Sequence, residues 1–260
     1  MENFAEGLFA GDRPSPAQAD SRGTLAGVLF DMDGLLVDTE PLWFEVEKSV
    51  MAGLGAGEWT AADQQELVGG SLYKSVAYMI GRAARPADPG DVATWLVDGM
   101  TELLHTREIE PMPGAVELVG AVRAAGLPYA LVTSSERVIA DAVLSALARR
   151  GVWFDVIVCG ADVANPKPDP EPYLLGAKLL GVDPRSCVGL EDSPNGVTSA
   201  LAAGCVTVAV PGLAPVEDRP GLHVVGSLAE LDLEALRGLV AAAPLGDGPL
   251  GVFLDECAAR

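Results

Sequence analysis

Residues 27–40 read GVLFDMDGLLVDTE, and the rest of the chain is best understood from this stretch outward. The apolar residues 26–30 predict a short strand that is buried on both faces, as in a parallel sheet. Asp31 and Asp33 follow at the carboxyl end of that strand, where ligands bind in open α/β sheets. Two carboxylates one residue apart repel each other, so they predict either a pair that shares a proton or a site for a divalent metal ion. A strand that simply ends in an acidic turn is the third possibility at this point.

The length and composition of the chain set broad limits on its class. With 260 residues, it can hold one sizeable core, or one core with a smaller unit inserted. Its 17 basic and 37 acidic residues give a net charge of −20, which argues against nucleic acid and anionic membrane surfaces as partners. The four cysteines lie far apart without metal-ligand spacing, which favours reduced thiols in a cytoplasmic protein. No apolar run has the length of a membrane span, and residues 1–22 lack the features of a signal peptide, so we expect a flexible tail there.

The pattern downstream predicts two structural units. Residues 40–110 show helical periodicity without a good strand candidate, so we expect an inserted helical bundle, or cap, in this range. Two prolines and a glycine just beyond it predict a hinge back to the main unit. After the hinge, helical patterns alternate with short apolar runs, which is typical of a Rossmann-like, doubly wound parallel sheet in an α/β fold. The expected main unit therefore comprises residues 23–39 and 111–243, and residues 244–260 are a second tail of unassigned role.

Two further segments carry groups that suit an anion. Thr133 and Ser134 follow the strand expected at 129–132, and their hydroxyl and N–H groups suit either binding an anion or capping the next helix. Lys167 stands between two prolines that stiffen its loop. It is therefore either a fixed point charge that binds phosphate or an ordinary exposed turn lysine.

A second acidic strand end completes the pattern. Glu191 and Asp192 follow an apolar run. Capping of the next helix by Asp192 or Ser193 is the alternative, but it does not account for Glu191, which is costly at a buried strand end unless it is paired. Because the carboxyl ends of parallel strands meet at one edge of a sheet, Asp31 and Asp33 are expected beside them. Lys167 offsets only one of these four negative charges, so the cluster needs a hard divalent cation, most simply Mg²⁺. The metal and the lysine together make a pocket that a phosphate dianion can enter.

Four motifs in this order, DMDGLLVDTE, VTSS, NPKPDP and GLEDSPNG, make the chain similar to the haloacid-dehalogenase superfamily of phosphohydrolases. The helical insert between the first two motifs resembles the cap of the β-phosphoglucomutase-like branch. The segment FDMDGLLVDTEPLW is especially similar to bacterial sugar-phosphate phosphatases of the 2-deoxyglucose-6-phosphatase type. The resemblance covers nearly the whole chain except its tails.

The resemblance implies a role for each motif residue. Asp31 would attack phosphorus and form an aspartyl-phosphate, and Asp33 would protonate the leaving group and then activate water. Mg²⁺ would be held by groups from the first and last motifs: Asp31, the backbone carbonyl of Asp33, Glu191 and Asp192. The transferring phosphoryl group would be held by groups from the two middle motifs: Thr133, the Ser134 N–H and Lys167.

The cap leaves the substrate and the reaction type open. The loop Gly69-Gly70-Ser71 is expected either to face the core and recognise the substrate or only to link two helices. Trp43 stands where β-phosphoglucomutases have a hinge histidine, and Leu72 falls near the position of their cap arginine. Both differences favour a Mg²⁺-dependent phosphatase for small phosphomonoesters such as sugar phosphates, which we expect to be a monomer or a weak dimer. A phosphomutase and a non-catalytic protein that binds a phosphorylated ligand are the alternatives.

Overall fold

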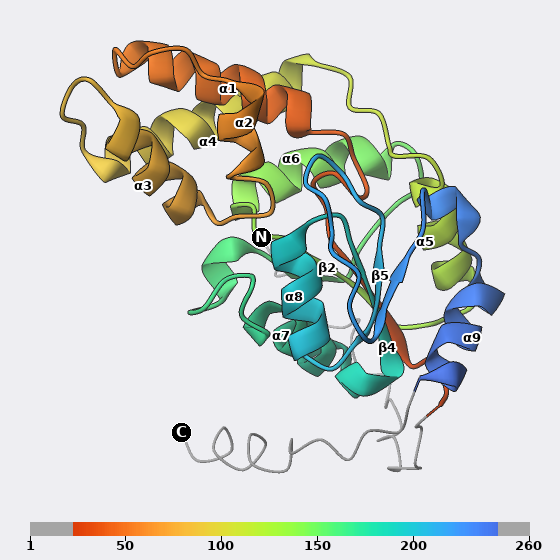
Figure 1. Cartoon of the computed structure of the whole chain (residues 1–260). Helices are drawn as coiled ribbons and strands as arrows, with labels where there is room; N and C mark the ends of the chain where they lie inside the picture. Colours follow the sequence, from red (N-terminus) through yellow and green to blue (C-terminus); the bar gives the residue numbers. More distant parts are fainter. Residues whose placement is uncertain (1–22, 244–260) are drawn as a thin grey trace, which may run out of the picture.

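The computed structural model describes residues 23–243, and the two expected tails lie outside the described residues. The described chain forms a six-stranded parallel sheet in the order β3-β2-β1-β4-β5-β6 (Figure 1). The strands are β1 (Gly27–Phe30), β2 (Tyr129–Val132), β3 (Val156–Val158), β4 (Cys187–Glu191), β5 (Val206–Ala209) and β6 (Leu222–Val224). The predicted doubly wound α/β fold is confirmed.

The order of the strands places the first motif at a reversal of the chain's path. The chain runs outward from β1 through β2 to β3, and then returns to the other side of β1 to build β4, β5 and β6. In open α/β sheets, ligands bind outside the carboxyl ends of the strands at such a reversal. Phe30 pairs with Leu131 on one side and with Leu190 on the other. The residues that follow these three therefore emerge together at one edge of the sheet.

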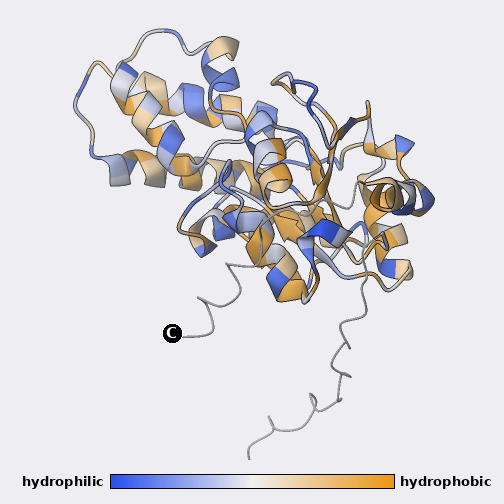
Figure 2. Cartoon of the chain, turned by 60° about the horizontal axis from the view of Figure 1, so that its bottom comes forward, coloured by the Kyte–Doolittle hydropathy of each residue, from blue (hydrophilic) through white to orange (hydrophobic). Residues whose placement is uncertain are grey.

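Helices cover both faces of the sheet because the buried strand residues alternate between two apolar clusters. Val28 and Phe30 contribute to the cluster on one face, and Leu29 contributes to the cluster on the other. The first face is covered by α5 (Ala115–Ala124), α6 (Arg137–Ala148) and α9 (Leu233–Ala242). The second face is covered by α7 (Glu171–Leu180) and α8 (Pro194–Ala202). Figure 2 shows hydrophobic residues concentrated along the strands and on the helix sides that cover them.

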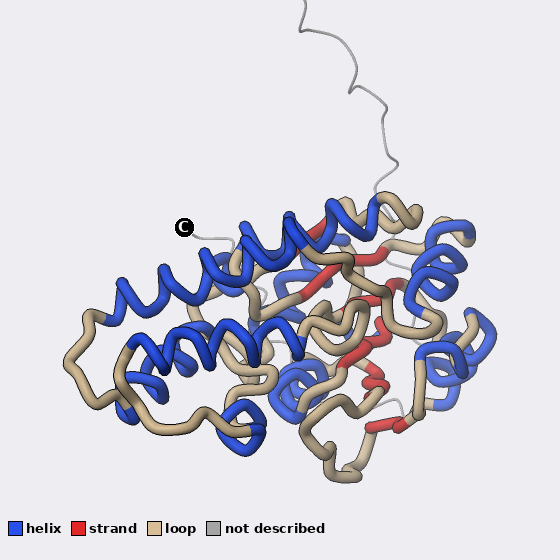
Figure 3. Tube along the Cα trace, turned by 90° about the horizontal axis from the view of Figure 1, so that it is seen from above, coloured by secondary structure: helices blue, strands red, loops and turns tan. Residues whose placement is uncertain are grey.

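The helical cap lies between β1 and α5 in the sequence and beside the sheet in space (Figure 3). Its helices are α1 (Glu40–Gly53), α2 (Ala61–Gln65), α3 (Leu72–Arg82) and α4 (Pro89–Thr106). Leu96 and Met100 of α4 are fully buried, and Gly99 between them lets α1 approach closely. A Cβ atom at Gly99 would lie 2.9 Å from Cγ1 of Val46, so a larger residue would push the two helices apart.

The cap contacts the core at several points around the carboxyl edge of the sheet. Helix α4 packs against α6. Near α2, Gln65 Nε2 donates a hydrogen bond of 2.9 Å to the carbonyl oxygen of Leu213. Asn195 Nδ2 of α8 donates one of 3.4 Å to the carbonyl oxygen of Gly69. The cap is therefore docked over the strand ends rather than extended away from them.

The structure also bears on the expectations about thiols and membrane spans. Cys159, Cys187 and Cys205 are buried free thiols, as expected for this part of the chain, and Cys257 lies outside the described residues. Within residues 23–243, every helix is too short or too polar to cross a bilayer.

Candidate active site

Asp31 is held at the carboxyl end of β1 by both its backbone and its side chain. Its N–H donates to the carbonyl oxygen of Leu190 at 3.0 Å, which continues the pairing of β1 with β4 by one residue. Its Oδ1 lies 2.6 Å from Nζ of Lys167, and the whole residue is 6% exposed. Its Oδ2 has no hydrogen-bond partner among the described residues. One oxygen of this carboxylate is therefore paired and the other is left for chemistry.

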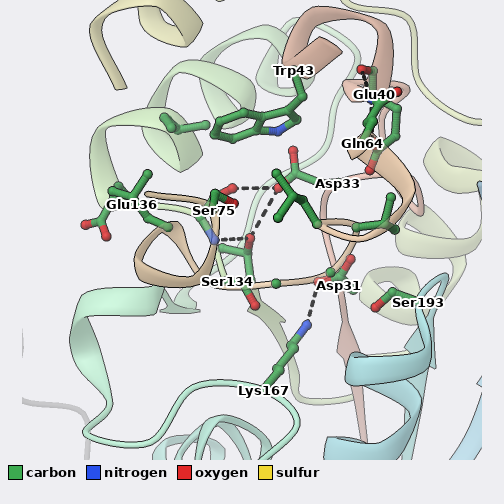
Figure 4. A pocket seen from close by; sticks show the side chains of 18 of the residues that line it. Asp31, Asp33, Glu40, Trp43, Gln64, Ser75, Ser134, Glu136, Lys167 and Ser193 are labelled. Carbon is green, nitrogen blue, oxygen red and sulfur yellow. Dashed lines mark hydrogen bonds and ion pairs between the residues drawn. The ribbon is translucent and has the colours of Figure 1, made fainter. Parts of the chain in front are cut away.

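Lys167 is a buried cation with three partners. Its Nζ lies 2.6 Å from Asp31 Oδ1 (Figure 4). It also lies 2.6 Å from Glu191 Oε1 and 2.8 Å from the carbonyl oxygen of Val132. Burial alone would lower the pKa of Lys167, but the two carboxylates outweigh it and raise that pKa above its ordinary value. The alternative of an exposed turn lysine is therefore wrong, because the residue is only 4% exposed.

Glu191 is fully buried and has a partner that sequence reasoning missed. The hydroxyl of Tyr173 donates to Glu191 Oε1 at 2.5 Å, on the same oxygen that Lys167 contacts. Ser193 Oγ lies 3.4 Å from the other oxygen. A Cβ atom at Gly196 would overlap this carboxylate, so the glycine is what lets Glu191 lie against the first turn of α8. Tyr173 was not predicted because a tyrosine on an apolar helix face usually fills core space, and only its hydroxyl partner distinguishes it.

Asp33 has a separate set of partners from Asp31. Thr39 Oγ1 donates to Asp33 Oδ1 at 2.5 Å, and Ser135 Oγ donates to Asp33 Oδ2 at 2.7 Å. No hydrogen bond joins the carboxylates of Asp31 and Asp33, so the alternative of a proton-sharing pair is not supported. Thr39 occupies the N-cap position of α1, as expected, but its hydroxyl serves Asp33 and makes no capping hydrogen bond. The sequence did not reveal that Thr39 binds Asp33, because the two residues are not adjacent in the chain.

The loop after β2 forms the wall opposite the first motif. Thr133 Oγ1 lies 3.5 Å from Asp33 Oδ2 and accepts a hydrogen bond of 3.0 Å from the Ser135 N–H. The alternative that this loop caps the next helix is wrong, because α6 has Glu136 at its N-cap position and no side-chain cap. Ser134 Oγ is buried and has no partner. A buried hydroxyl without a partner is uncommon in proteins and suits a ligand oxygen.

The acidic cluster fits a divalent cation. Ligand oxygens of Asp31, Glu191 and Asp192 lie within 4.8 Å of one another, and all three residues are buried. Asp192 Oδ2 has no hydrogen-bond partner, and capping of α8 is done instead by Ser193, which accepts from the Gly196 N–H at 3.2 Å. An unpaired buried carboxylate oxygen is costly unless a cation approaches it.

The pKa values of the acidic cluster also favour a bound cation. Burial first, and then the neighbouring carboxylates, raise the pKa of Asp31 to about 8 and hold the pKa of Asp192 well above its usual range. Gly34 has a φ of +78°, and a Cβ atom there would overlap Asp192 Oδ2. The chain therefore turns closely around this oxygen. The carboxylate of Asp33 is not part of the group, so its expected contribution through the backbone carbonyl stays a prediction.

A cavity of about 80 Å³ lies between the acidic edge of the sheet and the cap. Its core side includes all of the predicted catalytic and phosphate-binding residues: Asp31, Asp33, Thr133, Ser134 and Lys167. Gly69 and Gly70 of the predicted cap loop line it, whereas Ser71 is not among the lining residues and instead caps α3 by accepting from the Lys74 N–H at 3.3 Å. The expectation of a substrate-facing loop therefore applies to the two glycines only.

Other cap residues line the cavity; of these, Trp43 was expected either to pack at the hinge or to form a wall for the substrate, and the polar residues were not predicted. Trp43 faces the site from the cap side of Asp33, and Glu40 and Gln64 lie together beside it (Figure 4). Gln64 Nε2 donates to the carbonyl oxygen of Glu40 at 2.7 Å and to its Oε2 at 3.1 Å. Glu47 lines the cavity as well. In the sequence these residues only mark the polar positions of two helices, so no local signal distinguished them from a solvated face.

The parallel sheet, the buried carboxylate and lysine cluster at its edge and the docked helical cap together define a capped α/β enzyme. A sequence model of the haloacid dehalogenase-like hydrolases matches residues 28–210, and the chain belongs to this family. The family and the enzyme class predicted from the sequence are confirmed.

Relatives with known names cover most of the chain. Hexitol phosphatase A of Escherichia coli (strain K12) is 34% identical over 231 residues, which is 85% of this chain and 96% of the relative. Fructose-1-phosphate phosphatase of the same organism is 33% identical over 187 residues, which is 71% of this chain and 96% of the relative. Among solved structures, CbbY from Rhodobacter sphaeroides in complex with phosphate has a TM-score of 0.75 at 30% identity, covering 82% of this chain and 99% of that one.

Proposed function

We propose that this chain is a Mg²⁺-dependent phosphatase that hydrolyses small phosphate monoesters, with sugar and sugar-alcohol phosphates as the substrate class. The observation that carries the proposal is the pairing of Asp31 with Lys167 at the floor of the cavity beneath the cap, with Asp33 separately positioned above it (Figure 4). The phosphatases of hexitol phosphates and fructose 1-phosphate among the relatives support the same substrate class.

In this proposal Asp31 is the nucleophile. Lys167 binds its Oδ1, which fixes the direction of the carboxylate and partly offsets the rise in its pKa caused by burial. A free oxygen of Asp31 attacks phosphorus, the bond from phosphorus to the ester oxygen breaks, and an aspartyl-phosphate forms. Lys167, Thr133 and Ser134 neutralise or hydrogen-bond the phosphoryl oxygens, where negative charge gathers in the transition state.

Asp33 is the proton carrier in both halves of the reaction. It lies on the cap side of Asp31, where the leaving group of a substrate in the cavity would be (Figure 4). Its proton passes to the ester oxygen as the alcohol leaves. It then takes a proton from the water that attacks phosphorus, the bond from phosphorus to Asp31 breaks, and orthophosphate is released. Thr39 and Ser135 hold the Asp33 carboxylate in place through both steps.

The cation is assigned to Asp31, Asp192 and the backbone carbonyl of Asp33. Both oxygens of Glu191 already have partners, so its contribution is to position Lys167 and to add negative charge nearby. When bound, Mg²⁺ supplies positive charge that lets the phosphate dianion approach the carboxylates.

The cap favours hydrolysis over phosphoryl transfer to a second site. A mutase must hold a second phosphate, but the cap residues that line the cavity include neither lysine nor arginine. Lys74, the nearest candidate in sequence, turns away and donates to the carbonyl oxygen of Glu66 at 2.7 Å. The indole of Trp43 replaces a titratable hinge group. The cytoplasmic location, the monomeric or weakly dimeric state and the exclusion of nucleic acid and membrane partners stay predictions.

The Asp31→Asn variant tests the proposal. Asparagine keeps the shape of the side chain but is a poor nucleophile, so phosphate release from a panel of sugar phosphates with Mg²⁺ should fall at least about 1000-fold. Circular dichroism establishes that the variant is folded. Turnover within tenfold of the wild type would exclude Asp31 as the nucleophile, and absence of phosphate release by the wild type on the whole panel would exclude the function.

A further inference from the structure

The cap side of the cavity carries two carboxyl groups that the reaction does not use. Glu40 and Glu47 lie about two helical turns apart on α1, and both line the cavity. Glu40 is bonded to Gln64, but Glu47 has a different environment. The floor of the cavity is already strongly acidic, so acidic groups at its far end are unexpected for a site that accepts an anionic ester.

Glu47 is nearly completely buried, and only one of its two carboxyl oxygens has a hydrogen-bond partner. It is 4% exposed, and its Oε2 accepts a hydrogen bond of 3.1 Å from Nε1 of Trp59. No donor among the described residues lies within hydrogen-bond distance of its Oε1. Among the described residues, the buried side-chain atoms without a partner are Ser134 Oγ and Asp192 Oδ2, so Glu47 Oε1 is open to the cavity, where a ligand group can bind it.

The surroundings of Glu47 favour a neutral partner. Burial raises the pKa of Glu47 to about 8, so this carboxyl holds its proton near neutral pH and can both donate and accept a hydrogen bond. No lysine or arginine lines the cap side of the cavity, which gives a second anionic group on the substrate nothing to bind. A hydroxyl group matches both the donor and the acceptor capacity of a protonated carboxyl.

The rest of the cap wall is apolar in a way that suits a carbohydrate. Trp43, Leu67, Val68 and Leu72 line the cavity around the polar groups. Sugars and sugar alcohols present C–H groups that pack against aromatic and aliphatic side chains, and hydroxyls that need a small number of placed polar partners. One buried carboxyl in an apolar wall is such a partner.

We propose that Glu47 is a specificity-determining residue, whose free carboxyl oxygen Oε1 hydrogen-bonds a hydroxyl at the end of the substrate remote from the phosphate. The inference rests on the proposed phosphatase function and deepens it by naming the residue that recognises the hydroxylated part of the substrate. Bisphosphates are disfavoured, because the cap side of the cavity offers no lysine or arginine to a second phosphate.

The test compares Glu47→Leu, Glu47→Gln and wild type on three esters with Mg²⁺: sorbitol 6-phosphate, fructose 1,6-bisphosphate and p-nitrophenyl phosphate, which has no hydroxyl that Glu47 could bind. The readout is the ratio of kcat/KM for sorbitol 6-phosphate to kcat/KM for p-nitrophenyl phosphate. In Glu47→Leu this ratio should fall about 10- to 100-fold, as expected for a lost hydrogen bond to a buried carboxyl. Glu47→Gln retains a carbonyl oxygen and a donor and should recover most of the ratio.

Glu45→Gln is the matched control, because Glu45 lies on the same helix but its side chain is 51% exposed and pairs with Arg107. Its ratio should stay within twofold of the wild type. An equal loss of activity on sorbitol 6-phosphate and p-nitrophenyl phosphate in Glu47→Leu would show a structural role and overturn the inference. Preference of the wild type for fructose 1,6-bisphosphate over sorbitol 6-phosphate would overturn it as well. Absence of phosphate release by the wild type from all three esters would instead refute the phosphatase function itself, and the inference with it.

Discussion

Replacing Tyr173 by phenylalanine removes one hydroxyl from the centre of the molecule and changes nothing else. Tyr173 is fully buried, and its hydroxyl donates to Oε1 of the equally buried Glu191. The substitution conserves the ring, so it leaves no cavity of the size that destabilises a core. The measured effect therefore reports the hydrogen bond to the carboxylate.

The expected loss follows from the partners of Glu191. A hydrogen bond to a charged group contributes about 1.5–3 kcal/mol, and its loss here leaves a buried carboxylate with Lys167 as the main remaining donor. At about 2–4 °C per kcal/mol for a chain of this size, the midpoint of thermal unfolding should fall by roughly 3–12 °C. The free energy of unfolding in Mg²⁺-free buffer should fall by about 1.5–3 kcal/mol, because the hydrogen bond is the only interaction that the variant loses.

The assay is urea unfolding at pH 7, followed by tryptophan fluorescence and by far-ultraviolet circular dichroism, so that separate unfolding of the cap would be visible. Tyr129→Phe is the control, because the hydroxyl of Tyr129 on β2 makes no hydrogen bond within the described residues, and it should change stability by less than about 0.5 kcal/mol. A Tyr173→Phe variant as stable as Tyr129→Phe would refute the reasoning, since Glu191 would then not depend on the phenol.

Three further outcomes are expected. Asp192→Asn removes a ligand oxygen, so it should raise the Mg²⁺ concentration for half-maximal activity at least about tenfold. It should also abolish the rise in unfolding temperature that Mg²⁺ gives the wild type. An unchanged Mg²⁺ dependence would contradict the assignment of Asp192 as a ligand. Gly34→Ala should cost about 1–3 kcal/mol of stability in urea unfolding because φ is +78°, and should inactivate the enzyme because its Cβ overlaps Asp192 Oδ2; full activity would contradict this. Glu47, with its pKa raised from 4.5 to about 8 in the folded state, stabilises the fold below pH 4.5 and loses this contribution as the pH rises to 8. The free energy of unfolding should therefore fall by roughly 1–3 kcal/mol more in the wild type than in Glu47→Gln between pH 5 and 8, and parallel curves in urea would refute it.

Much of the fold was predictable because its signals are local. The bounds predicted for β2 coincide with Tyr129–Val132, where a short apolar run follows a proline and ends at hydroxyl residues. The parallel sheet followed from the alternation of such segments, and the strand ends then followed from the direction common to all strands. The acidic pairs and Lys167 were found in this way, because each is adjacent to a strand end or set between prolines.

The partners of those residues were decided only by the tertiary structure. Lys167 meets Asp31 across 136 residues, Ser135 meets Asp33 across 102, and Gly69 meets Asn195 across 126. Tyr173 and Glu47 had no signal of their own, because a tyrosine or a glutamate on a helix has the same local pattern whether it faces a site, the core or water. The sequence by itself determined the sheet, the cap and the catalytic strand ends, through periodicity and the chemistry of adjacent residues. The packing of separate elements decides which carboxylate oxygen is paired, which is free and which cap residues line the cavity. That packing is set by contacts between segments that are far apart in the sequence.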